Sequence, residues 1–465
     1  MPHYDLCVIG TGSGNSIVDD RFAGLSVAML DDGVRFGGTC LNVGCIPTKM
    51  FVLPADAART PGEAARLGVH LDPATADWPA IRDRIFGRID PISTGGEAYR
   101  AHAPNVTLHR STGRFVAPKT LEVDGDTLTA DQFVIAAGSR PAIPAIDGLA
   151  DAFARGRAHT SDTIMRLDEL PSSLVILGSG FIAAEFAHVF SAFGTRVTIC
   201  ARSGVMLRQE DADISRRYTE AVHDYATFVG GFQADQVETH AGGVRLHGTS
   251  PAGDTCSLDA EILLVATGRI PNADRLAVGN AGVETNAAGR VVVDDFQRTT
   301  ADGVWALGDV CGPWQLKHVA NHEARVVQHN LLHPDDLVMA NHHAVPHAVF
   351  GHPQVAAVGL TEDQSRASGR DIAVAVQPYG TTAYGWALED TTSVAKVVAD
   401  RATGEILGGH VIGPHASTLI QPLIQAMATG LDAATMARGQ YWIHPALTEV
   451  VENALLALDL DPDAA

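Results

Sequence analysis

The chain contains little lysine, little cysteine and no long uninterrupted apolar run. Its 465 residues include four lysines and six cysteines, and 54 acidic residues against 33 basic ones give a formal net charge of -21. So acidic a chain is a poor candidate for binding nucleic acid or an anionic membrane surface. Six scattered cysteines are too few for a disulfide framework. The N-terminus shows no basic segment followed by an apolar run, so we expect a cytoplasmic protein that is not secreted.

The longest nearly apolar stretch runs from 172 to 194 and is interrupted by Glu185 and His188. It also contains a glycine turn, so we interpret it as strand, turn and helix and not as a membrane span. The length of the chain is sufficient for three or four domains with a large core.

Two segments each show a strand, a glycine-rich turn, a helix and a second strand, which is the pattern of a dinucleotide-binding unit. The expected strands are 4–10 and 25–30 in the first unit, and 174–177 and 196–199 in the second. One such match is weak evidence, but two in the same strand-turn-helix context are strong. We therefore expect the chain to bind two nucleotides, or one nucleotide twice.

In the first unit, Gly10 and Gly12 would let the backbone approach a pyrophosphate at a helix N-terminus, and Gly14 follows them. The third glycine position of the fingerprint holds Asn15, so the packing of helix on strand should be looser there. Asp31, at the end of the second strand, is placed to accept hydrogen bonds from ribose hydroxyls.

In the second unit, the turn carries Gly178, Gly180 and Ala183. Arg202 follows the second strand, where an NAD-binding protein usually presents an acid, and Arg208 stands nearby. Because arginine pairs with a 2'-phosphate that an acid would repel, we interpret this unit as an NADPH site. The alternative is two ordinary surface arginines in a loop.

Two cysteines, Cys40 and Cys45, lie five residues apart just after the first unit. The ring that they could close is too small to make a good structural staple, so we expect a disulfide that opens and closes during turnover. Pro47 suits a first helical turn, and a helix starting at Cys45 would favour a thiolate there. Lys49 stands beside the pair in a chain that uses arginine nearly everywhere else. It is our candidate partner for Glu185, an acid in an apolar stretch.

Near the C-terminus, His444 precedes a proline, and Glu449 follows five residues later. Thiol-disulfide exchange needs an acid that protonates the departing thiolate, and imidazole has a suitable pKa. Glu449 could orient the ring. A zinc site at the cysteine pair is rejected because a structural site needs four ligands and no second pair exists, so no metal is expected.

Four units are expected along the chain. The chain is expected to leave each nucleotide domain at the end of a strand that is followed by a glycine. These strands are 133–137 and 262–267. From about Asn341 the pattern changes to antiparallel strands followed by helices near 416–430 and 446–458, which indicates a separate α+β domain. We predict the boundaries 1–150, 151–270, 271–341 (completing the first domain) and 342–465.

These motifs together resemble the FAD-dependent pyridine nucleotide-disulfide oxidoreductases, over nearly the whole chain, and look most like the mycothione reductases among them. The segments that carry the resemblance are 10–15, 37–52, 379–387, Gly308-Asp309 and the pair His444 and Glu449. The resemblance implies an α/β fold with two Rossmann-like domains, for FAD and NADPH, and a C-terminal α+β dimerisation domain. It also implies a homodimer in which His444 of one subunit serves the cysteines of the other.

The resemblance implies a role for each motif. Reduced flavin would open the Cys40-Cys45 disulfide, with Cys45 facing the flavin and Cys40 attacking a small disulfide substrate such as mycothione. Lys49, paired with Glu185, would sit beside the flavin, and Phe181 would cover it until NADPH arrives. The implied FAD contacts are Gly10, Gly12, Gly14, Asp31, Thr39, Lys49, Gly138, Gly308, Asp309 and His318. The implied NADPH contacts are Gly178, Gly180, Phe181, Ala183, Arg202, Arg208 and Gly268.

Other functions compete with this interpretation. Dihydrolipoamide dehydrogenase shares the cysteine motif but generally uses NAD, against which Arg202 argues. Glutathione reductase uses NADPH but typically has a second lysine where this chain has Thr48. A non-enzymatic alternative is an FAD-loaded redox sensor, or a subunit docked on a larger complex.

Overall fold

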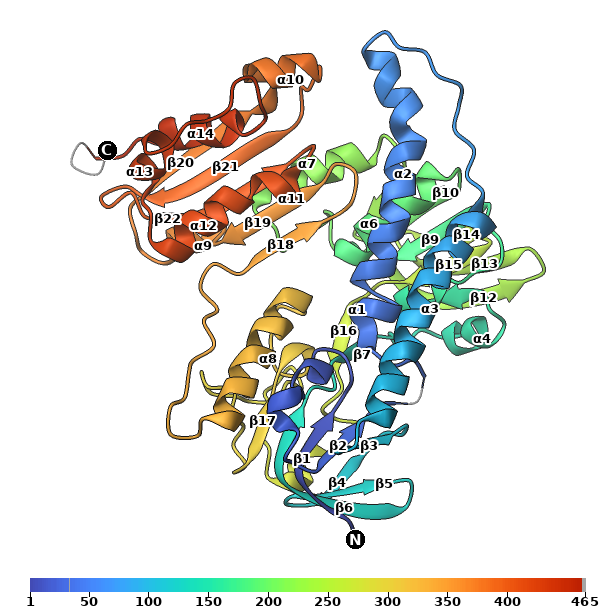
Figure 1. Cartoon of the computed structure of the whole chain (residues 1–465). Helices are drawn as coiled ribbons and strands as arrows, with labels where there is room; N and C mark the ends of the chain where they lie inside the picture. The colour runs from blue at the N-terminus through green and yellow to red at the C-terminus, as the bar shows by residue number, and fades with distance from the viewer. Residues whose placement is uncertain (33, 462–465) are drawn as a thin grey trace.

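The structure, a computed structural model, describes residues 1–32 and 34–461. Figure 1 shows an N-terminal domain at the bottom, a second domain at the right and a C-terminal domain at the upper left. The long helix α2 (Cys45–Arg66) runs up along the second domain, and α3 (Trp78–His102) returns to the first. No helix in these two described ranges has both the length and the apolar character needed to cross a membrane.

The N-terminal domain is built on a sheet with the strand order β3-β2-β1-β6-β5-β4, and β17 also pairs with β6. The neighbours β3, β2, β1, β6 and β17 are parallel, whereas β5 and β4 return antiparallel. All residues of β2 are buried, as expected for a strand covered on both faces. The strands are β1 (His3–Ile9), β2 (Val27–Leu30), β3 (Val106–His109), β4 (Arg114–Ala117), β5 (Thr120–Val123), β6 (Asp126–Ile135) and β17 (Val304–Ala306).

Because β17 returns to this sheet, part of the segment 271–341 belongs with the N-terminal domain. The domain boundaries themselves stay predictions. The helix α8 (Lys317–Leu332) follows β17 and packs on the same domain.

The helix expected between the first two strands is wrong. The chain there forms only two short 3-10 helices, η1 (Gly14–Ser16) and η2 (Asp20–Phe22), and the Asp19 side chain caps the second by accepting a hydrogen bond from Arg21 N–H. Side chains satisfy the carbonyls that a regular helix would have bonded. Arg100 donates to the Asn15 and Val18 carbonyls at 2.6 and 2.8 Å.

The second domain repeats the nucleotide pattern in the form that the sequence predicts, with β9, the helix α6 (Phe181–Ala192) and β10 in succession. Its parallel sheet has the order β11-β10-β9-β15-β8. An antiparallel sheet, β12-β13-β14, projects at the right of Figure 1. The strands are β8 (Ala158–His159), β9 (Ser173–Leu177), β10 (Arg196–Ala201), β11 (Thr227–Gly230), β12 (Gln233–His240), β13 (Gly243–Thr249), β14 (Thr255–Ala260) and β15 (Ile262–Val265); the other helices are α4 (Leu149–Ala154), α5 (Ser161–Ile164) and α7 (Ala212–Val222).

The C-terminal domain is an antiparallel sheet, β18-β19-β22-β21-β20, covered by short helices. The strands are β18 (Pro346–Val349), β19 (Val355–Gly359), β20 (Ile372–Pro378), β21 (Val394–Asp400) and β22 (Ile406–Ile412). The helices are α9 (Glu362–Ala367), α10 (Ala383–Ala387), α11 (Ala416–Leu419), α12 (Gln421–Thr429), α13 (Ala433–Arg438) and α14 (Glu449–Leu456). The predicted α/β fold with a C-terminal α+β domain is confirmed.

A buried lysine joins the C-terminal domain to the second domain. Lys396 of β21 is 2% exposed, and its Nζ lies 2.8 Å from Asp211 and 3.0 Å from Asp213 at the start of α7, and 2.7 Å from Glu362 of α9. Removing the lysine would leave the buried carboxylate of Asp211 without its cation, so we expect this cluster to stabilise the docking of the two domains.

Candidate active site

The two cysteines of the predicted redox pair lie side by side. Cys40 is in the short helix α1 (Gly38–Asn42), and Cys45 is the first residue of α2, which confirms the predicted helix start. The turn between them is tight, because a Cβ on Gly44 would lie 2.9 Å from the Thr39 carbonyl oxygen. Both cysteines are free thiols, and their side chains share a hydrogen bond. The sulfurs are therefore close enough to exchange between dithiol and disulfide.

The two thiols differ in acidity. The hydrogen bond from Cys45 lowers the pKa of Cys40 to about 7 despite burial, and the positive charge of Lys317 and the amides of Ile46 and Cys45 also lower it. The pKa of Cys45 is raised, chiefly by its neighbour Cys40. In the dithiol, Cys40 has the lower pKa of the two. The thiolate that we expect at Cys45, in contact with the flavin of the loaded enzyme, stays a prediction.

The first glycine turn forms a cradle for a nucleotide. Gly10 has a φ of 110°, and a Cβ there would lie 2.3 Å from the Ala136 carbonyl oxygen. A Cβ on Gly38, at the start of α1, would lie 2.6 Å from Gly12 Cα, and one on Gly14 would also collide with Ala136. The backbone approaches so closely only because these residues lack side chains. Such a turn at the carboxyl end of parallel strands fits the pyrophosphate of FAD.

Asp31, the predicted ribose ligand, follows β2 and is buried. Its carboxylate accepts a hydrogen bond from the Thr11 hydroxyl and pairs with Arg110, which also lies 3.1 Å from Glu97. The Thr11 hydroxyl accepts a hydrogen bond from Gly37 N–H at 3.0 Å. Sequence reasoning missed both partners: Thr11 stands inside the glycine turn, whereas Arg110 carries no local signal. The ribose role of Asp31 stays a prediction.

In the second glycine turn, a residue without a side chain again lets the backbone approach a carbonyl closely. Gly178 has a φ of 134°, and a Cβ there would lie 2.2 Å from the Ala266 carbonyl oxygen, whereas a Cβ on Gly180 would meet nothing within 4 Å. Leu207 N–H donates to the Ser179 carbonyl at 2.8 Å. This bond folds the loop after β10 back against the turn.

Arg202 and Arg208 are exposed in that loop, and within the described residues neither makes a hydrogen bond or an ion pair. Their guanidinium groups are therefore available to an anionic ligand beside the turn. In α6, Ala183 is fully buried, and Phe181, the first helical residue, is 47% exposed.

Gly308 and Asp309, the predicted flavin-side pair, are held by two side chains. Gly308 N–H donates to buried Glu323 at 2.6 Å, and the Ser139 hydroxyl donates to Asp309 at 2.6 Å. Glu323 also contacts His342 at 2.9 Å. Burial raises the pKa of Glu323, and the hydrogen bonds from Gly308 and His342 oppose that rise.

Gly138 and Gly268, where we expected the chain to leave the two nucleotide domains, lie beside each other. Each glycine has a positive φ and precedes a strand of the small ladder β7 (Ser139–Pro141) and β16 (Arg269–Pro271). Arg269 Nε donates to the Ser139 hydroxyl at 2.8 Å. The ladder connects the two nucleotide domains at the level of Asp309.

The expected contact between Lys49 and Glu185 is wrong. Among the described residues they form no ion pair, because Phe350, which follows β18, contacts both. Lys49 Nζ lies 3.9 Å from the centroid of the Phe350 ring, and the backbone N–H of Phe350 donates to Glu185 at 2.9 Å. Burial raises the pKa of Glu185 to about 7, and Lys49 opposes this only through its charge. Burial lowers the pKa of Lys49, with Asp56 and then Glu185 acting against it.

His444 and Glu449 form the predicted pair. His444 Nδ1 lies 2.8 Å from Glu449 Oε1, and Glu449 Oε2 accepts a hydrogen bond from Ala446 N–H at 3.1 Å. The histidine side chain is 70% exposed. It precedes α14 in the C-terminal domain, which Figure 1 shows apart from α1. Within the described part of the chain, its hydrogen bonds and ion pairs involve Glu449 and no cysteine. The single chain therefore does not bring His444 to the dithiol.

The helix α8 begins at Lys317, as expected for the segment near His318. His318 is exposed, and its Nε2 lies 2.8 Å from the Pro346 carbonyl oxygen. Lys317 Nζ donates to the Ser13 hydroxyl of the first glycine turn at 2.8 Å. Its charge acts on Cys40, a relation that the sequence could not show because the two residues lie far apart along the chain.

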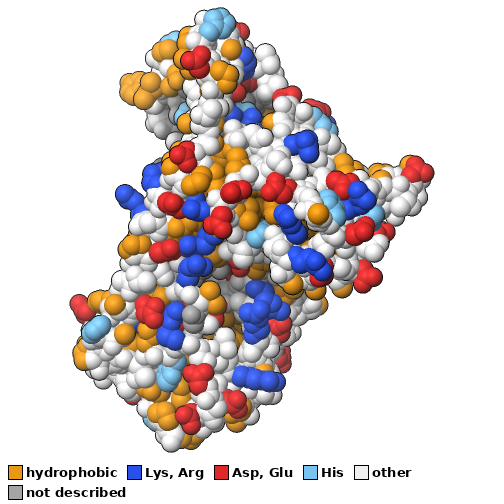
Figure 2. All heavy atoms as spheres, turned by 90° about the vertical axis from the view of Figure 1, so that its right-hand side faces the viewer, with side chains coloured by type: hydrophobic (Ala, Val, Ile, Leu, Met, Phe, Trp, Pro, Cys, Tyr) orange, Lys and Arg blue, Asp and Glu red, His pale blue; other side chains and the backbone are white. Residues whose placement is uncertain are grey.

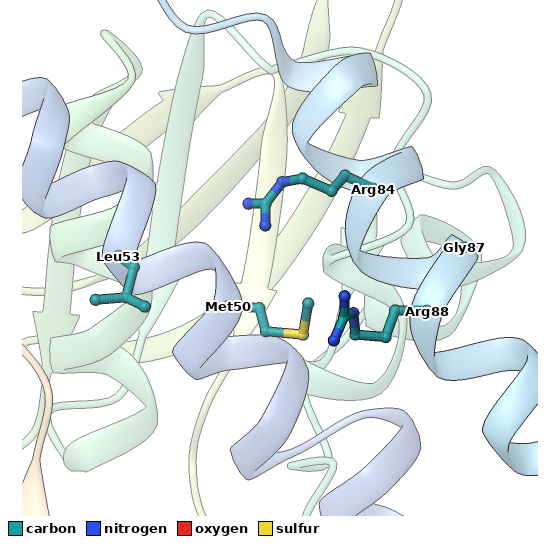
Figure 3. Close-up of a pocket in the computed structure, with 5 residues that line it drawn as sticks. All are labelled: Met50, Leu53, Arg84, Gly87 and Arg88. Carbon is teal, nitrogen blue, oxygen red and sulfur yellow. The ribbon is translucent and has the colours of Figure 1, made fainter.

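A cleft of about 790 Å³ lies between α2 and α3, lined by Met50, Leu53, Arg84, Gly87 and Arg88. The side chains of Met50 and Arg88 extend toward each other across it (Figure 3). None of the individual site residues that we predicted from the sequence lines this cleft, although Met50 belongs to the segment 37–52 that carries the family resemblance. On the molecular face in Figure 2, acidic and basic side chains are interspersed.

Comparisons with known proteins agree with this arrangement. The family model described as pyridine nucleotide-disulphide oxidoreductase matches residues 4–324, and the model of its dimerisation domain matches 345–455. Mycothione reductase from Mycobacterium tuberculosis (strain H37Rv) is 52% identical over 475 residues, which cover 98% of this chain and all of that protein. Dihydrolipoyl dehydrogenase from Corynebacterium glutamicum is 31% identical, with 97% of each chain covered.

A solved structure is also similar over the whole chain. The HOCl-induced flavoprotein disulfide reductase RclA from Escherichia coli superposes with a TM-score of 0.85 at 28% identity, covering 98% of this chain and 100% of that one. The glycine turns, the paired cysteines and these relatives lead to one conclusion: the chain belongs to the pyridine nucleotide-disulphide oxidoreductases, enzymes that use FAD and NAD(P)H.

Proposed function

We propose that this enzyme uses NADPH to reduce mycothione, the disulfide of mycothiol, in the cytoplasm. The observation that carries the proposal is the 52% identity to mycothione reductase over 98% of the chain. The adjacent thiols of Cys40 and Cys45 supply the chemistry that such a reduction needs.

The glycine turn and its surroundings would hold FAD. Gly10 and Gly12 would face its pyrophosphate, Asp31 its ribose and Asp309 its ribityl chain. Bound FAD supplies a flavin that carries an electron pair from NADPH to the cysteine pair. Lys49 would place a positive charge beside that flavin.

The cysteines then carry the electron pair to the substrate. Cys40, with its lowered pKa, attacks one sulfur of the substrate disulfide, so that bond breaks and a mixed disulfide forms. Cys45 next attacks the Cys40 sulfur, which releases the second thiol and leaves the Cys40-Cys45 disulfide. Each departing thiolate takes a proton, the first from His444, whose ring Glu449 orients.

Because His444 lies apart from α1 in the single chain, the proton must come from a partner subunit. We therefore propose a homodimer with two composite sites, which the match to a dimerisation domain at 345–455 supports. The C-terminal segment that carries His444 is suited to this role, since Tyr441 and Ile443 beside it expose their side chains almost fully (103% and 75%).

A comparison of substrates tests the proposal. Purified enzyme is assayed for oxidation of NADPH and of NADH with the disulfides of mycothiol, glutathione and lipoamide. We expect kcat/KM to be highest for NADPH with mycothione. Dominant activity with lipoamide and NADH would identify a dihydrolipoamide dehydrogenase, and dominant activity with glutathione disulfide a glutathione reductase. Absence of turnover with all three would favour a redox sensor or docking subunit.

A further inference from the structure

The cleft between α2 and α3 presents apolar and cationic groups to the solvent. Met50 and Leu53 of α2 line one side of it, and Leu53 is 59% exposed. Arg84 and Arg88 of α3 line the other side and are also exposed (Figure 3). In the described part of the chain neither arginine makes a hydrogen bond or an ion pair, whereas Arg82 of the same helix pairs with two carboxylates. The two guanidinium groups at the cleft are therefore free to bind another group.

This lining suits an aromatic ring with a hydroxyl group. A methionine thioether packs favourably against a ring, and a leucine adds apolar contact. A guanidinium group binds favourably over the face of a ring and can donate a hydrogen bond to a phenolic oxygen. The volume of about 790 Å³ exceeds that of a single side chain, so the cleft can also take part of the backbone that carries the ring. A tyrosine on an exposed segment of a protein has this chemistry.

Such a tyrosine stands three residues before His444. Tyr441 and Ile443 are exposed in a segment without helix or strand. Trp442 between them is half-buried, packs on the core of the C-terminal domain and donates from its indole N–H to the Ala437 carbonyl at 3.0 Å. Because neighbouring side chains of an extended chain point to opposite sides, the anchored Trp442 turns Tyr441 and Ile443 outward.

A second copy of the chain is the partner that this segment indicates. The model of the dimerisation domain matches residues 345–455 and so includes the segment. Large side chains as exposed as Tyr441 and Ile443 within such a domain are typical of a subunit interface. In the proposed dimer, His444 gives a proton to the thiolate released at Cys40 of the partner subunit. The segment must then lie against that subunit near the start of α2.

An apolar strip of α2 leads from the cysteine pair to the cleft. Ile46, which follows Cys45 directly, is exposed, Met50 is half-buried and Leu53 is exposed. The spacing of four and then three residues places these three side chains on one face of the helix. A segment that reaches the dithiol from outside therefore finds apolar surface along α2 to pack on.

The distances along the two segments agree with this placement. Met50 lies five residues after Cys45, which corresponds to about 7.5 Å along a helix. Tyr441 lies three residues before His444, which an extended chain spans in about 10 Å. With His444 at the cysteine pair, Tyr441 can therefore reach the cleft.

We propose that Tyr441 of one subunit docks in the cleft between α2 and α3 of the other and so holds His444 at the cysteine pair. This inference rests on the proposed function in placing His444 at the dithiol of a second subunit. Tyr441 is a positioning residue, because it acts through His444 and contacts neither substrate nor cofactor. The free guanidinium groups of Arg84 and Arg88 are the polar partners of its ring and hydroxyl.

Photo-crosslinking locates Tyr441 in the dimer directly. The full-length, FAD-loaded enzyme with Tyr441→p-benzoylphenylalanine is irradiated, covalent dimers are separated on a denaturing gel, and the joined peptides are identified by mass spectrometry. We expect a covalent dimer in which position 441 is joined to a peptide of α2 or α3. Crosslinks only within one chain, or only to another surface of the partner, would overturn the inference.

Two further positions serve as the reciprocal and the control. The same reagent in place of Leu53 should capture the segment 439–444 of the other subunit. In place of Val116, which is exposed in β4 of the same domain, it should give no covalent dimer. A covalent dimer from all three positions would mean that the capture is unspecific, and the inference would fail.

Kinetics separate a positioning role from a general loss of structure. Tyr441→Ala should lower kcat for a disulfide substrate by about tenfold to a hundredfold, because His444 is no longer held in place. The rate at which NADPH bleaches the flavin should not change, since that step does not need His444. Tyr441→Phe keeps the ring and should stay near the wild type. An unchanged kcat in Tyr441→Ala, or an equal loss in both steps, would contradict the positioning role.

A double variant tests the contact between the two residues. Leu53→Ala should cause part of the same loss in kcat, and the variant that combines it with Tyr441→Ala should lose less than the product of the two single effects. Effects that simply multiply would show that Tyr441 and Leu53 act independently.

The crosslinks are measured without any disulfide substrate. A crosslink in the cleft of an enzyme that does not reduce mycothione would overturn the proposed substrate and leave the docking of Tyr441 intact. An enzyme that reduces mycothione but forms no such crosslink would keep the proposed function and lose this inference.

Discussion

At the scale of single residues, the proposed use of NADPH assigns the choice of nucleotide to the exposed guanidinium groups of Arg202 and Arg208 beside the second glycine turn. We predict that Arg202→Ala raises KM for NADPH by about tenfold to a hundredfold, because a charge-assisted hydrogen bond to the 2'-phosphate contributes roughly 1.5 to 3 kcal/mol. The KM for NADH should not change. Steady-state kinetics with both nucleotides provide the measurement.

A matched control is available at the other end of the same strand. Arg196 is exposed at the start of β10, away from the carboxyl end where a nucleotide binds. Arg196→Ala should leave both KM values unchanged. An equal loss for NADH and NADPH in Arg202→Ala would mean that this arginine does not bind a 2'-phosphate.

Glu185 should make stability depend on pH. Its pKa is raised from 4.5 to about 7 by burial, so between these values the folded protein binds a proton that the unfolded chain does not. The free energy of unfolding of the wild type therefore falls as pH rises through this window, by at most about 3 kcal/mol. Glu185→Gln removes this contribution.

Thermal melting of wild type and Glu185→Gln from pH 4.5 to 8 measures the effect. The melting temperature of the variant should rise relative to that of the wild type as pH increases, and the difference should level off above pH 7. A constant difference across this range would show that Glu185 keeps an ordinary acidity.

At the scale of elements, the two turn glycines of the second domain should fail in different ways. Gly178→Ala places a Cβ 2.2 Å from the Ala266 carbonyl oxygen at a φ of 134°, so we expect a loss of stability of roughly 1 to 3 kcal/mol or more. Gly180→Ala meets no protein atom within 4 Å. It should melt like the wild type and lose only affinity for NADPH.

Melting curves and NADPH titrations of both variants provide the comparison, with FAD content as the control for the N-terminal domain. A normal melting temperature in Gly178→Ala would contradict the geometry of this turn. Normal NADPH affinity in Gly180→Ala would mean that the nucleotide does not approach the backbone there.

Local pattern was sufficient to predict some elements and not others. The second unit followed its apolar and glycine pattern closely, and the helix start at Cys45 followed from Pro47. In the first unit, the helix is replaced by short turns that depend on Arg100, a residue of α3 with no sequence signal of this role. Phe350 separates Lys49 from Glu185 in the same way, since its position is set by the packing of β18.

At the scale of the whole molecule, the composite site predicts complementation between two inactive variants. Cys40→Ser lacks the attacking thiol, and His444→Ala should lower turnover by about 10²- to 10⁴-fold, the usual contribution of a general acid. In a mixed dimer, the Cys40 of one subunit meets the His444 of the other, and one intact site results. A randomly reassembled equal mixture should recover about a quarter of the wild-type activity.

This mixture is prepared by dissociation and joint refolding, or by co-expression with two affinity tags. If mixed dimers form but regain no activity, His444 and Cys40 of the same chain act together in one site. The structure of the single chain, with α14 apart from α1, argues against that arrangement.

The proposed reaction depends on electron transfer from NADPH through the flavin to the sulfurs of Cys40 in α1 and Cys45 at the start of α2. Anaerobic titration of the FAD-loaded enzyme with NADPH, followed by absorbance, measures this directly. The wild type should develop a long-wavelength band from a thiolate in contact with the flavin, whereas Cys45→Ser should bleach its flavin without that band. A wild type that shows no band, or a Cys40→Ser or Cys45→Ser variant that keeps full turnover of the disulfide, would contradict the account.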